Sequence, residues 1–225
     1  MIEDSFRASG ARVYDLVTVS FVALLILSNI AATKLIGLHI GPALLVFDGG
    51  AILFPLTYVL GDVLAEVYGF AKAKRAILAG FVFSVLAALT FLAVGALPPG
   101  PGYENQEAFS AVLGFVPRIV TASVLGYLAG QLLNSWVLVR IKERWGEEHL
   151  WARLIGSTLV GEFADTLIFC TVAFYGVITG AEFLNYLFVG YAYKVGVEVV
   201  LLPVTYRAIR WINKIESKEA TDAKD

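Results

Sequence analysis

Six long apolar stretches constrain the fold of this chain more than any other feature of its sequence. A helix needs about 20 mostly apolar residues to cross the hydrocarbon core of a bilayer, and the six stretches cover residues 13–35, 51–70, 76–97, 119–139, 154–177 and 183–206. Because lipid offers no hydrogen-bond partners, a spanning segment must satisfy its own backbone groups, as an α-helix does. The sequence therefore predicts an all-α membrane protein with six transmembrane helices.

The composition agrees with this prediction. Apolar residues make up 58% of the chain and charged residues only 16%, and the mean hydropathy is +0.76. A soluble domain carries roughly 25% charged residues, so this chain has too few charges to cover a water-exposed surface. The lone Cys170 lies in an apolar run, which excludes a disulfide framework. The first apolar run is too long for the core of a cleavable signal peptide, and we expect it to remain in the mature protein.

The chain divides into one transmembrane domain, residues 13–210, and two cytoplasmic ends, residues 1–12 and 211–225. The mixed charges after Ile215 predict a solvated and poorly ordered tail.

Two connections on the external side carry a structural signal. Segment 37–50 is apolar in its middle but is interrupted by Gly-Pro and Asp-Gly-Gly, and we interpret it as a hairpin or a half-helix dipping toward the membrane surface. Segment 97–117 is the longest external loop, and residues 103–113 within it could form a short surface helix.

The distribution of Lys and Arg predicts the orientation. If the six spans alternate in direction, 14 of the 17 basic residues fall on one side, Lys34 and Arg118 fall on the other, and Lys194 lies inside a span. Basic residues are enriched in cytoplasmic loops. Both termini are therefore expected in the cytoplasm.

Ionisable side chains inside the spans are the candidate functional residues, because such groups are costly in a bilayer and usually serve a purpose there. Asp62, Asp165 and Lys194 each lie about twelve residues into their span, near the bilayer midplane. Polar groups from several helices at one depth are what a polar ligand site in a bundle requires. The predicted substrate-binding residues are Asn29, Tyr58, Asp62, Glu66, Gln131, Asn134, Glu162, Asp165, Tyr193, Lys194 and Glu198.

A purely structural interpretation of these residues stays open. Lys194 could neutralise Glu198, one turn further along the same helix, and Gln131 and Asn134 could serve only as hydrogen-bonding contacts between helices. However, the five acids outnumber Lys194, so some of them must be protonated or must face water or a ligand donor. Aromatic neighbours such as Phe54 could stack on a flat ligand.

Two short similarities suggest an internal repeat. Residues 60–62 (Leu-Gly-Asp) are similar to residues 160–162 (Val-Gly-Glu), and the Tyr-Gly pair at 68–69 recurs at 175–176. Each pair of matches lies in the middle span of one three-span half, so the two halves would be inverted repeats, a common plan of transporters.

Enzymatic functions are not expected. The two histidines, His39 and His149, lie in loops on opposite sides of the membrane, and no His or Cys stands beside the acids to build a metal site. An intramembrane aspartyl protease could bring Asp62 and Asp165 together, but Val59 occupies the first position of the Gly-x-Gly-Asp motif that such an enzyme needs. No Gly-x-x-x-x-Gly-Lys loop is present to bind ATP.

The second apolar stretch carries the most specific motif of the chain. Residues 54–69 read FPLTYVLGDVLAEVYG, and this segment resembles the signature of the queuosine precursor transporter family, a group of six-span carriers. The likeness extends to Ser28-Asn29 and to segments 126–134 and 156–174. It implies a multi-pass protein of the cell membrane that takes up a 7-deazaguanine, either 7-cyano-7-deazaguanine (preQ0) or 7-aminomethyl-7-deazaguanine (preQ1).

The resemblance implies Asp62 and Glu66 as substrate-binding residues. The other site residues are predicted from their depth in the membrane and their polarity. The expected partners are a small-molecule substrate and the lipid bilayer, without cofactor, metal or nucleic acid. A homodimer, a proton-coupled carrier, facilitated diffusion and a substrate-binding subunit energised by a separate ATPase all remain compatible with the sequence.

Overall fold

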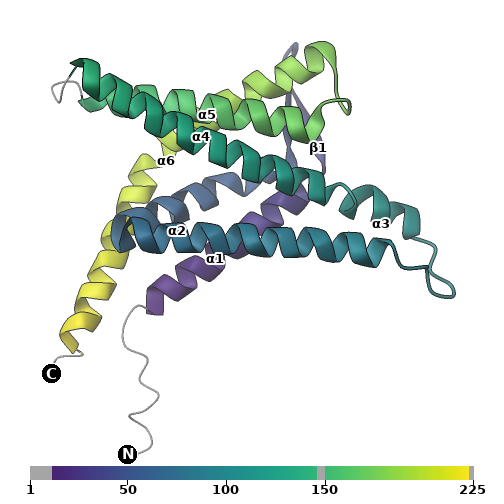
Figure 1. Cartoon of the computed structure of the whole chain (residues 1–225), viewed down its shortest axis with the longest axis horizontal. Coiled ribbons are helices and arrows are strands. Elements are labelled where there is room, and N and C mark those ends of the chain that lie inside the picture. The colour runs from purple at the N-terminus through teal and green to yellow at the C-terminus, as the bar shows by residue number, and fades with distance from the viewer. Residues whose placement is uncertain (1–11, 146–149, 223–225) are drawn as a thin grey trace, which may run out of the picture.

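The computed structural model of the protein describes residues 12–145 and 150–222. Figure 1 shows a bundle of long helices with a two-stranded sheet at one end. The elements in chain order are α1 (Arg12–Ala31), β1 (Leu35–Ile40), β2 (Ala43–Asp48), the 3-10 helix η2 (Gly49–Ile52), α2 (Phe54–Gly95), α3 (Gln106–Leu113), α4 (Val116–Trp145), α5 (Leu150–Phe174) and α6 (Gly180–Asp222).

Within the described residues, five helical segments are long and apolar enough to cross a membrane. They are α1, α2, residues 106–141 (α3 together with most of α4), residues 156–174 of α5, and α6. The prediction of a mostly helical, multi-pass membrane protein is confirmed. The strictly all-α prediction is wrong in one place, because β1 and β2 form a sheet between the first two long helices.

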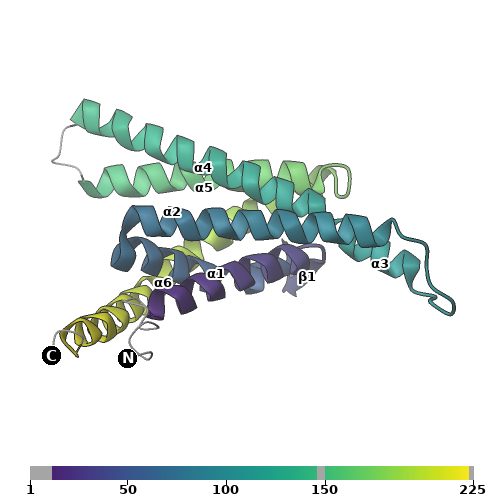
Figure 2. The same cartoon turned by 60° about the horizontal axis from the view of Figure 1, so that its bottom comes forward.

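Helix α2 covers two of the expected spans. Inside it, Gly69 has φ 80° and ψ 166°, which is not helical, and Figures 1 and 2 show the chain reversing direction there. Glycine takes this positive φ without a steric cost. Val63 before the turn packs in one buried cluster with Ala73 and Ala76 after it. The expected loop at residues 71–75 is therefore wrong, because a single glycine makes the turn and the helix resumes at once.

The external hairpin expected between the first two spans is a β-hairpin. Its strands pair from Leu35 opposite Asp48 to Ile40 opposite Ala43. The connecting turn begins at Gly41, whose φ is 60°. A glycine is favoured there because other residues rarely take a positive φ.

Several helix boundaries differ from the predicted ones. Helix α1 ends at Ala31, before residue 35, because the chain turns there into β1. Helix α3 (Gln106–Leu113) is the short helix expected in the loop 97–117. Helix α6 extends to Asp222, and thus continues beyond Ile215 into the predicted tail.

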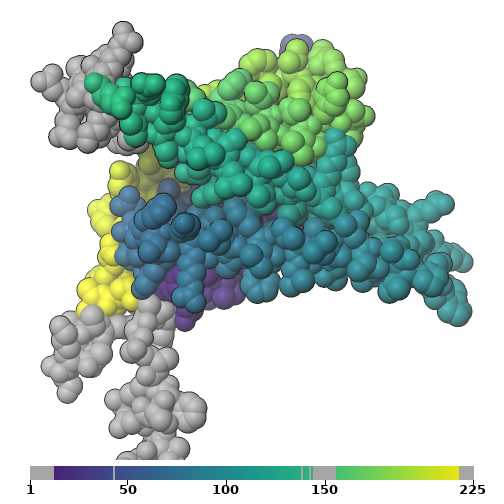
Figure 3. All heavy atoms as spheres, in the orientation of Figure 1, coloured from purple at the N-terminus to yellow at the C-terminus, as the bar shows by residue number. Residues whose placement is uncertain are grey.

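Buried side chains join the helices into two groups, and α6 belongs to both. In one group, Phe174 of α5 packs with Ile119 of α4 and Tyr186 of α6. In the other, Phe21 of α1 and Ile212 of α6 pack with residues of α2. A third cluster joins α2 to α4 through Ala88, Val116 and Val120, and Figure 3 shows the two helices in contact in the right half of the view.

The two ends of the bundle differ in what they contain. The start of α1, the end of α6, the turn within α2 and the ends of α4 and α5 that flank residues 146–149 lie at one end (Figure 1). The β-hairpin, α3 and the connection from α5 to α6 lie at the other end. The described residues that flank the predicted cytoplasmic segments are thus gathered at a single end of the molecule.

Candidate functional site

Three helices that are distant in the sequence meet through two polar contacts. The hydroxyl of Tyr58 in α2 donates a hydrogen bond of 2.5 Å to Oε1 of Glu162 in α5. The ammonium group of Lys194 in α6 forms an ion pair with Oδ2 of Asp165, one turn further along α5. The Lys194 Nζ also lies 4.9 Å from the centroid of the Phe54 ring in α2, within the range of a cation–π interaction. The structure thus brings together four of the predicted site residues, Tyr58, Glu162, Asp165 and Lys194.

The ion pair decides between two interpretations of Lys194. The sequence left Glu198, on the same helix, as a possible partner, but the structure pairs Lys194 with Asp165 instead. The side chains of Lys194 and Asp165 are only 16% and 21% exposed. A pair as buried as this neutralises two charges that would each be costly alone inside a membrane.

Glycines place α4 and α5 close enough to position Asp165. A Cβ atom added at Gly126 would lie 2.8 Å from Oδ1 of Asp165, and one added at Gly130 would lie 2.9 Å from the Asp165 Cβ. A Cβ atom added at Gly161 of α5 would lie 2.8 Å from the Cβ of Asn134 in α4. Small residues at a spacing of four let membrane helices approach in this way. The α4–α5 pair is therefore a tightly packed support for the acids of α5.

Three buried oxygens of α4 and α5 have no hydrogen-bond partner among the described residues. They are Oε2 of Glu162, Oδ1 of Asn134 and Oγ1 of Thr166. Buried polar atoms in folded proteins nearly always have a partner. The oxygens of Glu162 and Asn134 can only accept hydrogen bonds, whereas the Thr166 hydroxyl can also donate.

The remaining acidic and amide candidates are more open. Asp62, Glu66 and Gln131 are exposed, and Glu198 is half-buried. No hydrogen bond joins any of these four to another residue in the described part of the chain. A carboxylate inside an apolar span is too costly to leave against lipid, so these side chains are suited to a water-filled path or to a polar ligand.

Asn29 forms its hydrogen bonds with two serines and not with the acidic residues. Its Nδ2 donates to Oγ of Ser84 in α2 at 3.4 Å, and its Oδ1 accepts a hydrogen bond of 2.8 Å from Oγ of Ser123 in α4. Its side chain is buried. The amide therefore links α1, α2 and α4, a structural use of a polar group inside a membrane bundle.

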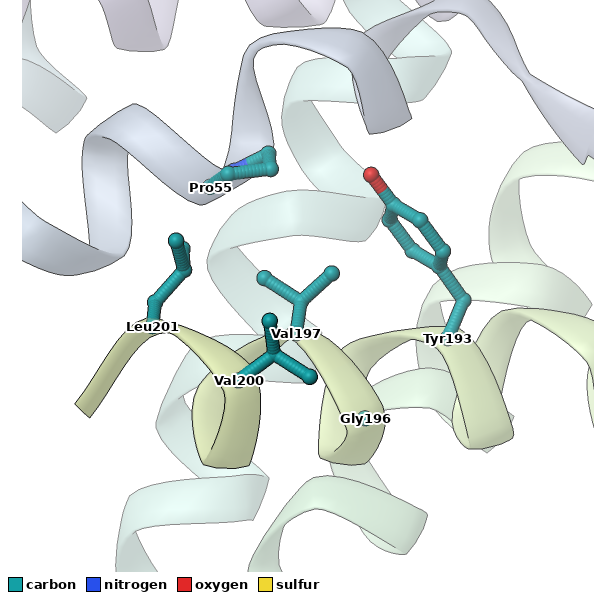
Figure 4. A pocket seen from close by; sticks show the side chains of 6 residues that line it. All are labelled: Pro55, Tyr193, Gly196, Val197, Val200 and Leu201. Atoms are coloured by element: carbon teal, nitrogen blue, oxygen red, sulfur yellow. The ribbon is translucent and has the colours of Figure 1, made fainter. Parts of the chain in front are cut away.

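Tyr193 borders an apolar hollow beside the polar contacts. Its hydroxyl donates to the carbonyl of Ala51 at 2.8 Å. Figure 4 shows its ring across the hollow from Pro55, with Val197, Val200 and Leu201 of α6 lining the hollow from below. The hollow has a volume of about 280 Å³. The lining residues are Pro55, Tyr193, Gly196, Val197, Val200 and Leu201.

A polar contact at the base of the β-hairpin is not among those predicted from the sequence. The hydroxyl of Tyr186 in α6 donates to Oδ2 of Asp48 at 2.7 Å, while Oδ1 accepts from the amide of Gly50 at 2.8 Å. Burial raises the pKa of Asp48 above its ordinary value of 3.8, and the hydrogen bond from Tyr186 opposes this rise. An Asp followed by two glycines is a signal for such a capping turn, in addition to interrupting the apolar run.

Asn185 of α6 also holds the hairpin. Its Oδ1 accepts from the amide of Val46 at 3.0 Å, and its Nδ2 donates to the carbonyl of Leu44 at 2.7 Å. The amide side chain thus pairs with the edge of β2, which would otherwise present unsatisfied backbone groups.

Comparisons with known proteins agree with this picture. The model of the family described as "Putative vitamin uptake transporter" matches residues 48–208. A "Probable queuosine precursor transporter" of Bacillus subtilis is 34% identical over 72% of this chain and 72% of its own length. The "Queuosine precursor transporter" of Escherichia coli is 28% identical over 70% of each chain, and a "Probable queuosine precursor transporter" of Haemophilus influenzae is 26% identical over 71% of this chain and 67% of its own. No solved structure matches the chain.

Proposed function

The chain belongs to the vitamin uptake transporter family, and on this basis we propose that it imports a 7-deazaguanine precursor of queuosine, preQ0 or preQ1, into the cytoplasm. It is a transporter of the cell membrane and not an enzyme. The observation that carries the proposed substrate is the similarity to three proteins named for queuosine precursor transport.

We further propose six membrane crossings with both termini in the cytoplasm. The crossings are α1, the two halves of α2 (54–68 and 70–95), α4, α5 and α6. The grouping of the start of α1, the end of α6 and the α2 turn at one end of the bundle supports this topology. The basic residues Lys72, Arg140 and Arg207 belong to segments at that end, as the positive-inside rule requires of the cytoplasmic side.

The substrate is proposed to bind where α2, α5 and α6 meet. A 7-deazaguanine presents a ring N–H and an exocyclic amine as adjacent donors, with a carbonyl acceptor beside them, and carboxylates and amides suit such an edge. Glu162 and Asn134 have unpartnered acceptors, and the Lys194 ammonium has more donors than its pair with Asp165 uses. The exposed Asp62, Glu66, Gln131 and Glu198 would line the path to this site, with the apolar hollow beside Tyr193 next to it.

Uptake of labelled 7-cyano-7-deazaguanine into cells that neither make nor import it tests this function. Cells that express the protein are expected to accumulate the label, whereas the Asp62→Asn and Glu162→Gln variants are expected to lose transport while still inserting into the membrane. Glu182→Gln, at the exposed start of α6, is the matched control. Absence of uptake by the unaltered protein would refute the substrate, and normal uptake by both variants would place the site elsewhere.

A further inference from the structure

We propose that Oε2 of Glu162 and Oδ1 of Asn134 together accept the two adjacent donors of the ligand, its ring N–H and its exocyclic amine. This inference rests on the proposed function and deepens it, because it assigns recognition of the guanine-like edge to two named atoms. The class of ligand that follows is a fused ring with a 2-amino-4-oxo pyrimidine edge.

The first argument is the state of the two oxygens. Both are shielded from solvent and lack a partner in the described part of the chain, and both can only accept. A buried acceptor without a donor is costly, and more so when it carries charge. A ligand that supplies two donors would satisfy both atoms at once.

The second argument is that the Glu162 carboxylate is oriented and that the helix carrying Asn134 packs closely against α5. The other oxygen of the Glu162 carboxylate holds the hydroxyl of Tyr58 at 2.5 Å, which orients the group. Asn134 lies at the level of Gly161, the residue before Glu162, because a Cβ atom added at Gly161 would lie 2.8 Å from its own Cβ. The close packing of α4 and α5 therefore presents both acceptors from one rigid support.

The third argument is that the neighbouring acid is already occupied. Lys194 pairs with Asp165, which leaves Glu162 as the acid of this cluster with an unpartnered buried oxygen. The Lys194 ammonium has three N–H donors and its pair with Asp165 does not use all of them, so the carbonyl of the same edge would have a donor available.

The test is competition binding to the purified protein in detergent, with labelled 7-cyano-7-deazaguanine as the probe. The competitors are 7-deazaguanine and 7-deazahypoxanthine, which differ only in the exocyclic amine. The unaltered protein is expected to bind 7-deazaguanine at least about tenfold more tightly, because loss of one donor leaves a buried acceptor unpaired.

The variants are Glu162→Gln and Asn134→Leu, with Asn134→Ala as a second substitution that adds no bulk at the α4–α5 contact. Each is expected to weaken binding of 7-deazaguanine by at least about tenfold. One of the two residues, Glu162 or Asn134, accepts from the exocyclic amine. Substitution of that residue is also expected to make 7-deazaguanine and 7-deazahypoxanthine bind equally. Glu182→Gln and Asn213→Leu, both at exposed positions of α6, should change neither affinity nor preference.

The outcomes separate the inference from the function. The unaltered protein could prefer 7-deazaguanine while every folded variant at 134 and 162 keeps both the affinity and the preference. The two oxygens would then be satisfied by water, and the inference would be overturned while the proposed function stands. Weaker binding without loss of preference in any variant would overturn it too. If the unaltered protein does not bind the probe, the proposed function fails and the inference fails with it.

Discussion

The hydroxyl of Tyr58 in α2 donates a hydrogen bond of 2.5 Å to Oε1 of Glu162 in α5, across 104 residues of sequence. This contact joins a helix of the α1–α2 group to the α4–α5 pair at the level of the candidate site. It also leaves the second oxygen of Glu162 without a partner among the described residues.

Removal of this hydroxyl should weaken ligand binding. In Tyr58→Phe the Glu162 carboxylate loses the contact that orients it, and we expect affinity for 7-cyano-7-deazaguanine to fall about tenfold, as hydrogen bonds to charged groups contribute about 1.5–3 kcal/mol. Competition binding measures the change. Tyr191→Phe, which removes a hydroxyl bonded to the carbonyl of Leu159 at 3.2 Å, is the control. Equal affinity in Tyr58→Phe and the unaltered protein would show that the contact has no role in binding.

Loss of Lys194 should destabilise the fold through Asp165. The single variant Lys194→Met leaves a buried carboxylate without its counter-charge, which is expected to cost about 3–5 kcal/mol. The double variant Lys194→Met/Asp165→Leu removes both charges and should recover most of that stability. The free energy of unfolding in detergent, measured for the two single variants and the double variant, tests the coupling. Additive losses in the double variant would mean that the two side chains do not interact.

A methyl group at Gly130 should disturb the α4–α5 contact. Its carbon would lie 2.9 Å from the Asp165 Cβ and from the carbonyl oxygen of Gly161, and overpacking of this kind typically costs about 1–3 kcal/mol. Gly196→Ala in α6 is the matched control, because nothing lies within 4 Å of the added carbon and alanine favours a helix over glycine. Thermal unfolding in detergent should show a loss of stability for Gly130→Ala alone. Equal stability of the two variants would contradict the close packing.

Cysteine labelling tests the proposed topology. The single native cysteine, Cys170, is buried at 1% exposure and should contribute little background. We expect a membrane-impermeant maleimide to label Tyr103→Cys in intact cells but to label Lys74→Cys and Lys214→Cys only after permeabilisation. Labelling of Lys214→Cys in intact cells would exclude a cytoplasmic C-terminus.

The buried Asp48 should make stability depend on pH. Because burial raises its pKa above 3.8, the folded state holds this proton more tightly than the unfolded state does. The free energy of unfolding should therefore fall as the pH rises from the ordinary pKa of Asp48 through its raised pKa in the folded state. In Asp48→Asn, which can keep its contacts to Gly50 and Tyr186, this contribution is absent, so unfolding temperatures of the two proteins should diverge with rising pH. A growing advantage of the unaltered protein over this range would contradict the direction of the shift.

The sequence by itself determined the helical membrane character of this protein and the presence of polar groups deep within its spans. Hydropathy and helical periodicity are local properties, so the apolar runs and the depths of Asp62, Asp165 and Lys194 could be read without a structure. The motif at residues 54–69 also sufficed to indicate the family, which the comparisons confirm.

Only the tertiary structure decided which of these groups meet. Lys194 pairs with Asp165, 29 residues away on another helix, and not with Glu198 on its own helix. Asn29 bonds two serines of the bundle and not the acids. The turn at Gly69 replaces a loop, and a β-hairpin held by Asn185 precedes α2. These arrangements depend on the packing of α4 against α5 and on the path of α6 between the two groups of helices. The spacing of Gly126 and Gly130 is a local signal for close helix packing, but it does not say which helix packs there or which side chains meet, because these relations arise only when the chain folds.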